Sequence, residues 1–423
     1  MRILVWATVV LAVGTSVGCG EPAEPAGDDG GVDAAPLPPL PADTAPCTQY
    51  DRWPDALASA RLPVLVHYRG PAEAAVAAEV LADVEGAWDV EVGRLGFRPP
   101  LPDAGRCGPD DRLDVFVWAG VDECYVDVVG ENPATPYDDE YAYLVVDPFG
   151  PYGGAILDTT VAHELDHVMQ SADDWDDLPI AYEMTAVFVE DEVVDAEDQY
   201  LAQVVDFQAH PDWSIDRDDG YQTWFMYGAA LYLRFVRDRY FAGDAAFIGE
   251  VWRRLRSPLG AGDPDLEDAL DAVLAPRGGS FLASVPEFAR WRVYTGTRAD
   301  AAHLEEAAAM AEPARLARVA ATTGGQVAVA PMLLGSAYVD VAGAPGARVA
   351  IELRGADPAA RWVVQVVPGA TADGDVIAAA SGPVVIDAGR DRTVVVTAMP
   401  PGPDDPDDRT DDRYSATLAV APR

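Results

Sequence analysis

The sequence contains no lysine, so arginine supplies every basic side chain apart from five histidines. Only 29 lysine and arginine residues stand against 71 acidic ones, and the formal net charge is -42 at pH 7. A nucleic-acid partner is not expected, because phosphate binding needs a basic face. We interpret acidic runs such as residues 212–219 and 404–412 as solvated surface, with calcium binding as the lesser alternative.

Cysteine is also scarce, and the four residues Cys19, Cys47, Cys107 and Cys124 include no CxxC pair. A cysteine metal site is therefore not expected. Cys107 and Cys124 flank a predicted strand and could be bridged in an oxidising compartment, which would leave Cys47 unpaired. The alternatives are that Cys47 pairs with one of these two or stays a free thiol.

Long apolar runs are lacking except at the amino terminus, where the run after Arg2 is too short for a spanning helix with its usual flanks. A basic start, an apolar stretch and small residues before Cys19 resemble a lipoprotein signal peptide, predicted at residues 1–18. Residues 19–46, rich in Pro, Ala and Asp, read as a disordered tether. Lipidated Cys19 would anchor the protein to a bacterial membrane, in the cell envelope or at the surface. Ser16 stands where leucine is typical, so plain secretion is the alternative.

Two of the five histidines lie in one HExxH motif, formed by His163, Glu164 and His167. Histidines four residues apart share one face of a helix, so both imidazoles can reach the same ion. Thr159-Thr160 offers an N-cap for this helix, and apolar residues fill its opposite side. Zinc in such a site lowers the pKa of a bound water to about 7, and the adjacent Glu164 can take its proton. The motif therefore indicates hydrolysis of an amide bond.

A third ligand is expected from a second helix, residues 178–194, which carries Glu183 among small and apolar residues. The acidic loop 173–177 would turn the chain between the two helices. Glu190 lies seven residues beyond Glu183, shares its face and could orient a ligand. Alternatively, Glu183 is an ordinary exposed helix carboxylate, although a buried one would need a partner.

The run from His163 to Gln170, the acidic loop with Trp175 and residues 182–193 resemble a family of secreted bacterial zinc metalloproteases in the gluzincin group of zincins. Residues 62–100, 112–118, 143–147 and 227–235 are also similar to it, so the resemblance covers about residues 60–310. It implies an α+β, zincin-like domain with a mixed sheet and two crossing helices. In that domain His163, His167 and Glu183 would bind zinc and Glu164 would be the base.

Asp166 departs from the family, which usually carries a large apolar residue at this position. Its carboxylate could raise the pKa of Glu164 or of the metal-bound water, or it could point to solvent. Catalytic competence is therefore a weaker prediction than metal binding.

The transition state of such a reaction needs a donor to its oxyanion besides the metal. Tyr227, Tyr221 and His210 are candidates, and Tyr227 is the one we predict. The competing interpretation of Tyr227 is a core position, since its segment carries aromatic residues at helical spacing.

Residues 264–311 are largely helical in pattern, with Phe281, Phe288, Trp291 and Leu304 as expected core. Beyond residue 320 the chain changes to short apolar runs separated by turn residues, which is typical of a β-sandwich. These runs begin at Gln326, Ala337, Arg348, Trp362, Pro383, Thr393 and Ser415. We therefore predict a zincin-like metalloprotease domain at 47–318 and a β-sandwich accessory domain at 319–423.

The sequence thus predicts a zinc-dependent endopeptidase of the cell envelope that cleaves a protein or peptide substrate. The strand at residues 144–147 is expected to pair with the extended substrate. The alternative is a catalytically inactive zincin-fold lipoprotein that acts as a binding or adhesion module. Asp166 supports that alternative, whereas the intact Glu164 argues against it. A third interpretation makes the motif accidental, and the sequence does not specify an oligomeric state.

Overall fold

The computed structural model describes residues 40–41, 44–196, 198–256, 258, 264–368, 375–378, 382–402 and 411–423. Helices and three sheets make these residues α+β, as predicted. The predicted signal peptide, Cys19 and most of the predicted tether lie outside the described residues. Within the described part, no helix is both long and apolar enough to cross a membrane.

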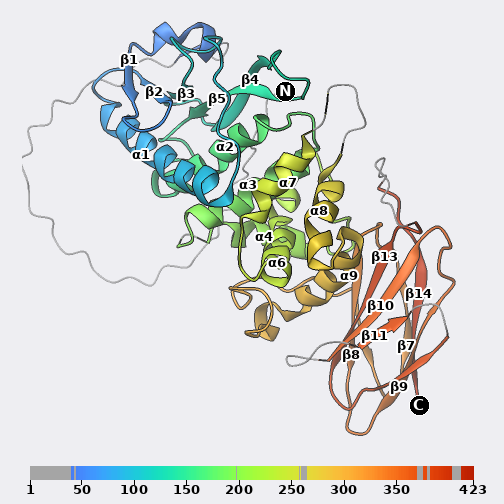
Figure 1. The fold of residues 1–423 in the computed structure, drawn as a ribbon. Coiled ribbons are helices and arrows are strands. Elements are labelled where there is room, and N and C mark those ends of the chain that lie inside the picture. The colour runs from blue at the N-terminus through green and yellow to red at the C-terminus, as the bar shows by residue number, and fades with distance from the viewer. Residues whose placement is uncertain are drawn as a thin grey trace, which may run out of the picture.

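The first part of the chain forms a five-stranded mixed sheet in the order β1-β2-β3-β5-β4 (Figure 1). Its strands are β1 (Asp55–Ala58), β2 (Val64–Tyr68), β3 (Leu113–Val117), β4 (Tyr125–Glu131) and β5 (Glu140–Val146). β2, β3 and β5 are parallel, whereas β1 and β4 run antiparallel at the two edges. Helices α1 (Ala74–Val90) and α2 (Leu157–Ser171) pack against this sheet.

Side chains of β3 alternate between the two faces of the sheet, as the period of a strand requires. Val115 and Val117 join the helices in the main core. Phe116 and Trp118 lie in a smaller cluster with Trp53, whose indole N–H donates to the carbonyl oxygen of Val117 at 2.8 Å. Both faces of the sheet are therefore covered.

The strand predicted to bind substrate, β5, lies inside the sheet. It pairs with β3 on one side and with β4 on the other. The prediction that residues 144–147 pair with a substrate is therefore wrong for β5, because both of its edges are already in use. The edge strand on this side is β4, which contains an irregularity between Val128 and Gly130.

The sheet also decides the pairing of the cysteines. Cys47 and Cys107 form a disulfide in the cluster on the face away from the helices. Cys124 is a buried free thiol in the main core on the opposite face. The expected bridge between Cys107 and Cys124 is therefore wrong, and the alternative that Cys47 pairs with one of the other two is confirmed.

The start of α2 also differs from prediction. The helix begins at Leu157, directly after a 3₁₀ turn at Gly154–Ile156. Thr159 and Thr160 lie inside the helix, so the predicted N-cap is wrong. The cap position makes no side-chain hydrogen bond, because it is occupied by Ile156, whose side chain has no acceptor.

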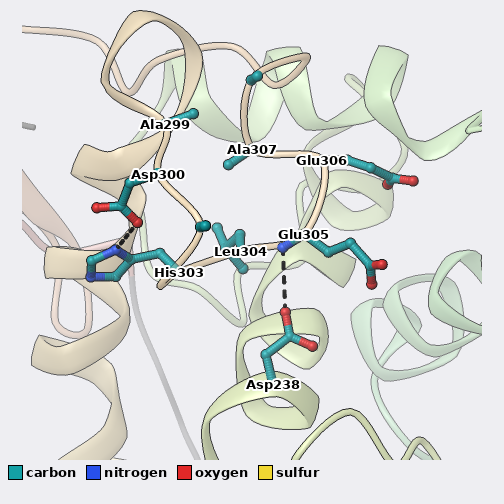
Figure 2. Close-up of a pocket in the computed structure, with 10 residues that line it drawn as sticks. Asp238, Ala299, Asp300, His303, Leu304, Glu305, Glu306 and Ala307 are labelled. Carbon is teal, nitrogen blue, oxygen red and sulfur yellow. Dashed lines mark hydrogen bonds and ion pairs between the residues drawn. The ribbon is translucent and has the colours of Figure 1, made fainter.

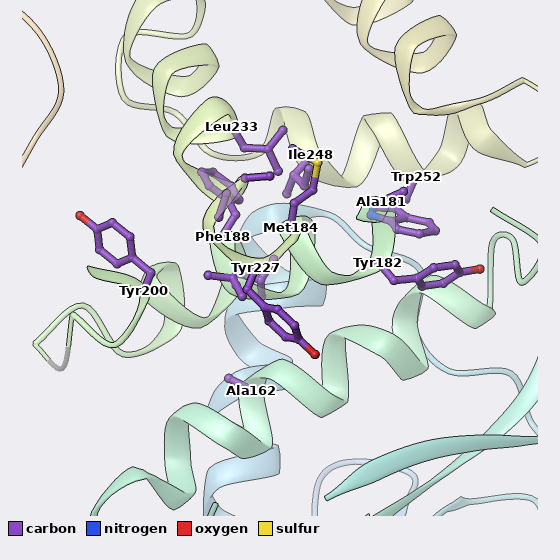
Figure 3. Packing of buried hydrophobic residues seen from close by; sticks show 14 of the residues in the cluster. Ala162, Ala181, Tyr182, Met184, Phe188, Tyr200, Tyr227, Leu233, Ile248 and Trp252 are labelled. Carbon is purple, nitrogen blue, oxygen red and sulfur yellow. The ribbon is translucent and has the colours of Figure 1, made fainter. Parts of the chain in front are cut away.

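Further helices fill the middle of the molecule, between the mixed sheet and the carboxy-terminal strands (Figure 1). They are α3 (Pro179–Val193), α4 (Tyr200–Ala209), α5 (Phe225–Gly228), α6 (Ala230–Tyr240), α7 (Phe247–Leu255), α8 (Leu266–Leu274) and α9 (Phe281–Trp291). Their apolar side chains extend the main core. Figure 3 shows Phe188 of α3 beside Leu233 of α6 and Ile248 of α7.

The stretch predicted as largely helical, residues 264–311, is helical mainly up to Trp291. Two short 3₁₀ turns follow, and residues 299–311 form an irregular loop. Thr295, between these two turns, is extended, with φ -115° and ψ 166°, and it interrupts the helical path. The predicted core residues Phe281, Phe288, Trp291 and Leu304 are all buried.

From Ala317 onward the chain forms two sheets, ordered β11-β10-β13-β8-β6 and β12-β9-β14-β7. The strands are β6 (Ala317–Ala320), β7 (Gly325–Val329), β8 (Ser336–Ala342), β9 (Arg348–Arg354), β10 (Arg361–Pro368), β11 (Asp375–Ala378), β12 (Val384–Asp387), β13 (Arg392–Met399) and β14 (Ala416–Pro422). Side chains of both sheets, such as Val339 and Leu418, meet in one core. Each run predicted as a strand is a strand, and β6 and β11 were not predicted.

The carboxy-terminal sheets contact the helices through α9, which lies against β10 and β13. Ala289, Val293 and Tyr294 pack there with Tyr338, whose hydroxyl donates to the carbonyl oxygen of Ala289 at 2.7 Å. A small apolar cluster therefore joins the two parts. The domain boundary between residues 318 and 319 stays a prediction.

Candidate metal centre

Helix α2 carries His163, Glu164 and His167 in its middle, where all three side chains are buried. The predicted apolar side of the helix is in the main core, with Val161, Leu165 and Val168 buried. The acidic loop 173–177 then turns the chain into α3, which begins at Pro179. Proline is well suited to a first helical turn, because its missing N–H has no partner there.

Helix α3 packs along α2 and brings Glu183 to the two histidines. The Nε2 atoms of His163 and His167 are 3.1 Å apart. Glu183 Oε2 lies 3.2 Å from His163 Nε2 and 3.8 Å from His167 Nε2. The exposed-carboxylate interpretation of Glu183 is therefore wrong, because its side chain is fully buried.

The far side of each imidazole is hydrogen-bonded to an acceptor. His163 Nδ1 lies 2.6 Å from Glu190 Oε1, so Glu190 takes the orienting position predicted for it. His167 Nδ1 lies 2.7 Å from Gln170 Oε1. When the ring proton lies on Nδ1, the Nε2 atom of each histidine can offer its lone pair to a metal ion.

Gln170 is a site residue that the sequence reasoning missed. The available signal was its spacing, since a residue three positions after His167 lies on the same helix face. Nothing in the residue type marks it, because glutamine is most often exposed.

The donor set fits a zinc ion. Two imidazole nitrogens and one carboxylate oxygen are ligands that zinc takes in hydrolases, with room for a further ligand. Both carboxylate oxygens of Glu183 are buried and have no hydrogen-bond partner among the described residues. Burial opposes a charge on His163, but the adjacent carboxylates of Glu183 and Glu190 outweigh it and raise its pKa well above the usual value. The site therefore favours a positive charge.

Glu164 is almost fully buried beside these groups. Burial raises its pKa to about 8, and the charges of Glu183 and Glu190 add to this while His163 opposes it. Burial lowers the pKa of the other histidine, His167, to about 4. Burial and the two neighbouring carboxylates therefore favour the protonated form of Glu164.

Of the predicted oxyanion donors, two tyrosines reach the site. The ring of Tyr227 stacks on His163 with centroids 6.0 Å apart. The hydroxyls of Tyr227 and Tyr221 are buried without a hydrogen-bond partner among the described residues. Burial raises the pKa of both, and the negative charge of Glu183 adds to the shift. His210 is placed differently, with its ring stacked on Trp213 at 4.0 Å.

Tyr221 also has an unusual backbone. Its φ is 61°, in the left-handed region that residues other than glycine rarely adopt. Such conformations persist where the surrounding structure holds them and are frequent at functional sites. The loop before α5 thus holds a strained residue whose hydroxyl lies by the metal ligands.

Asp166, the departure from the resembling family, does not point to solvent. It is fully buried, and its Oδ2 accepts a hydrogen bond from Gln170 Nε2 at 2.6 Å. Burial raises the pKa of Asp166 and of the neighbouring Glu91, and the charge of Asp166 adds to the shift of Glu91.

Two other groups of metal-binding residue types are explained without a metal. Asp103, Cys107 and Asp114 lie together, but the sulfur of Cys107 is engaged in the disulfide. Asp191, Asp198 and Glu306 also converge. The guanidinium of Arg234 pairs with Asp191 and Glu306, so this is an ion-pair network.

A pocket of about 560 Å³ lies away from the motif, under the loop 299–308 and against Asp238 of α6. Figure 2 shows Asp300 beside His303, with Oδ1 and Nδ1 2.7 Å apart. His303 stacks on Tyr294 with ring centroids at 3.8 Å, so this histidine is a packing residue. The pocket contains none of the predicted site residues.

In comparisons with known proteins, no protein-family model matches this chain and no curated protein matches its sequence significantly. The resemblance to secreted zinc metalloproteases therefore stays a prediction that rests on the residues of the motif.

Proposed function

We propose that this protein is a zinc-dependent endopeptidase with a zincin-like catalytic domain and a β-sandwich accessory domain. The observation that carries the proposal is the convergence of His163 Nε2, His167 Nε2 and the carboxylate of Glu183, within 4.8 Å of one another and buried. An accidental HExxH would not be expected to bring a third ligand from another helix to both histidines.

His163, His167 and Glu183 would hold the ion. When bound, zinc supplies Lewis acidity to a scissile carbonyl and lowers the pKa of a water molecule. The carboxylate of Glu164 accepts the proton of the attacking water and later returns it to the leaving amine. The hydroxyl of Tyr227 donates to the developing oxyanion, with Tyr221 beside it.

An extended substrate would pair with β4, because β4 is the edge strand and contacts α2. Strand addition uses unpaired backbone groups, which an interior strand such as β5 does not offer. The proposed substrate-binding strand is therefore β4, in place of the strand at residues 144–147 that the sequence predicted.

The location in the cell envelope, through a lipidated Cys19, is part of the same proposal. The disulfide between Cys47 and Cys107 agrees with an oxidising compartment. The tether before Cys47 would let the catalytic part reach substrates away from the membrane.

The competing proposal is an inactive binding module. Asp166 suggested a disabled site, but Asp166 is engaged with Gln170 behind His167. A binding module also has no use for a buried Glu164.

The test is zinc content and peptidase activity of the purified full-length protein. We expect about one zinc per chain, lost in His163→Ala and in Glu183→Ala. Glu164→Gln should keep the zinc and lower kcat by about 10²- to 10⁴-fold. A wild-type protein without zinc would contradict the proposal, and zinc without Glu164-dependent hydrolysis would favour the binding module.

A further inference from the structure

The side-chain amide of Gln170 lies between the metal ligand His167 and a set of acceptors behind it. Its Oε1 is 2.7 Å from His167 Nδ1. Its Nε2 donates to Asp166 Oδ2 at 2.6 Å and to the hydroxyl oxygen of Thr185 at 2.7 Å, and lies 3.2 Å from the carbonyl oxygen of Tyr182. The side chains of Gln170, His167, Asp166 and Thr185 are fully buried. Bulk water therefore cannot replace these bonds.

The orientation of this amide decides which nitrogen of His167 carries the proton. An amide has a donor end and an acceptor end. Asp166 Oδ2 and the carbonyl of Tyr182 accept, so the NH₂ end faces them and the oxygen faces His167. His167 Nδ1 must then be the protonated nitrogen, which leaves the lone pair of Nε2 for a metal.

All three groups at the NH₂ end accept a hydrogen bond from it, and Asp166 is the one carboxyl group among them. The hydroxyl of Thr185 donates its one proton to the carbonyl oxygen of Ala181, so toward Gln170 and Trp252 it can only accept. The carbonyl of Tyr182 makes the longest of the three contacts. Asp166 makes the shortest.

We propose that Asp166 is a positioning residue for the metal ligand His167 and acts through the amide of Gln170. The inference rests on the proposed zinc site. It gives a role to Asp166, which departs from the resembling family. That family usually carries an apolar residue at this position, and an apolar side chain could not accept a hydrogen bond from an amide. A hydrogen bond to the amide NH₂ also polarises the amide oxygen and strengthens its bond to His167.

The first test is Asp166→Asn in the full-length protein. Asparagine keeps the shape but can present either end of its own amide to Gln170, so the preference of Gln170 for one orientation becomes weaker, with Tyr182 and Thr185 as the acceptors that remain. Zinc affinity, measured by competition with a chelator, should fall about tenfold.

The protonation of His167 can be read directly in the zinc-free protein. The chain has only five histidines, so ¹⁵N-labelled histidine gives a simple NMR spectrum. In the wild type His167 should carry its proton on Nδ1, and in Asp166→Asn it should become a mixture of both tautomers. A wild-type His167 protonated on Nε2 would overturn the proposal without the need for any variant.

A double-mutant cycle separates positioning from a general structural effect. Gln170→Met removes the acceptor at His167 and should weaken zinc binding about 10- to 100-fold. Asp166→Asn should add nothing in this background, because Asp166 acts through Gln170. As a matched control, Glu190→Gln weakens the support of His163, so its fold-loss should multiply with that of Asp166→Asn.

The proposal is wrong if Asp166→Asn keeps wild-type zinc affinity and a single tautomer of His167. It is also wrong if the losses from Asp166→Asn and Gln170→Met multiply. Failure of the wild type to bind zinc would instead overturn the proposed function, and the tautomer of His167 would still test the role of Asp166.

Discussion

Two tyrosine hydroxyls, those of Tyr221 and Tyr227, lie by the candidate metal ligands without a hydrogen-bond partner among the described residues. An unpaired buried hydroxyl has an energetic cost that most folded proteins avoid. Such a group is useful where a charge develops during a reaction, because the donor is then already in place. The unpaired hydroxyls of Tyr227 and Tyr221 therefore support their proposed role as donors to an oxyanion.

We expect Tyr227→Phe to lower kcat about 100-fold with little change in KM, because the lost bond forms only in the transition state. Steady-state kinetics on a peptide substrate measures both constants. Tyr221→Phe tests the second hydroxyl in the same assay. Tyr232→Phe is the matched control, since the hydroxyl of Tyr232 bonds to Ser284 in the core at 2.7 Å and should affect stability alone. Equal losses of kcat in all three variants would contradict the assignment.

At the scale of elements, α1 and α2 bring like charges together. Asp83 of α1 is half-buried near Asp158 in the first turn of α2, and burial raises the pKa of Asp83 to about 6, with Asp158 and Glu79 adding to the shift. The folded protein therefore holds this proton more tightly than the unfolded chain. The stability that Asp83 contributes is present below about pH 4 and is lost as the pH rises through about 6.

Asp83→Asn should therefore stabilise the protein at pH 8 and leave it almost unchanged at pH 4. After allowing for solvent screening of a half-exposed group, the gain in the free energy of unfolding at pH 8 should be about 1 kcal/mol or less. Denaturant unfolding at the two pH values measures it.

Asp89→Asn on the same helix is the matched control for Asp83→Asn. Hydrogen bonds from Arg61 lower the pKa of Asp89, so this substitution should not stabilise the protein at pH 8. A gain for Asp83→Asn that is equal at both pH values would show that its ionisation is not the cause.

At the scale of the whole molecule, α9 and β8 join the helices to the carboxy-terminal sheets. Tyr338 is fully buried in that contact and donates to the carbonyl oxygen of Ala289. Arg292, also buried, lies over the ring of Phe207 and donates to Gln208, close to the same contact. This interface is partly apolar and partly hydrogen-bonded, so we expect the two parts to depend on each other for stability.

Tyr338→Ala should lower the free energy of unfolding by about 3 to 5 kcal/mol, because it removes a large buried side chain. Tyr338→Phe keeps the ring and loses one hydrogen bond, and should cost about 1 kcal/mol. Calorimetry of the full-length protein measures both. Equal costs for the two variants would mean that the ring contributes nothing to the contact, which would contradict this account of the interface.

The sequence by itself was enough to predict features that depend on residues close together in the chain. The spacing of His163 and His167 needs only the period of a helix, and Glu183 stood out as a carboxylate within an apolar helical run. The carboxy-terminal strands likewise follow from alternation and turn residues. The excess of acidic residues and the lack of lysine are properties of composition alone.

Only the tertiary structure decided how distant segments meet. It placed Cys124 on the opposite face of the sheet from Cys47 and Cys107, and it placed β5 inside the sheet. It also aligned Asp166, Gln170 and His167 in one buried network. Local patterns cannot specify such contacts, because strand order and the direction of a buried side chain depend on which segments pack against each other after the chain has folded.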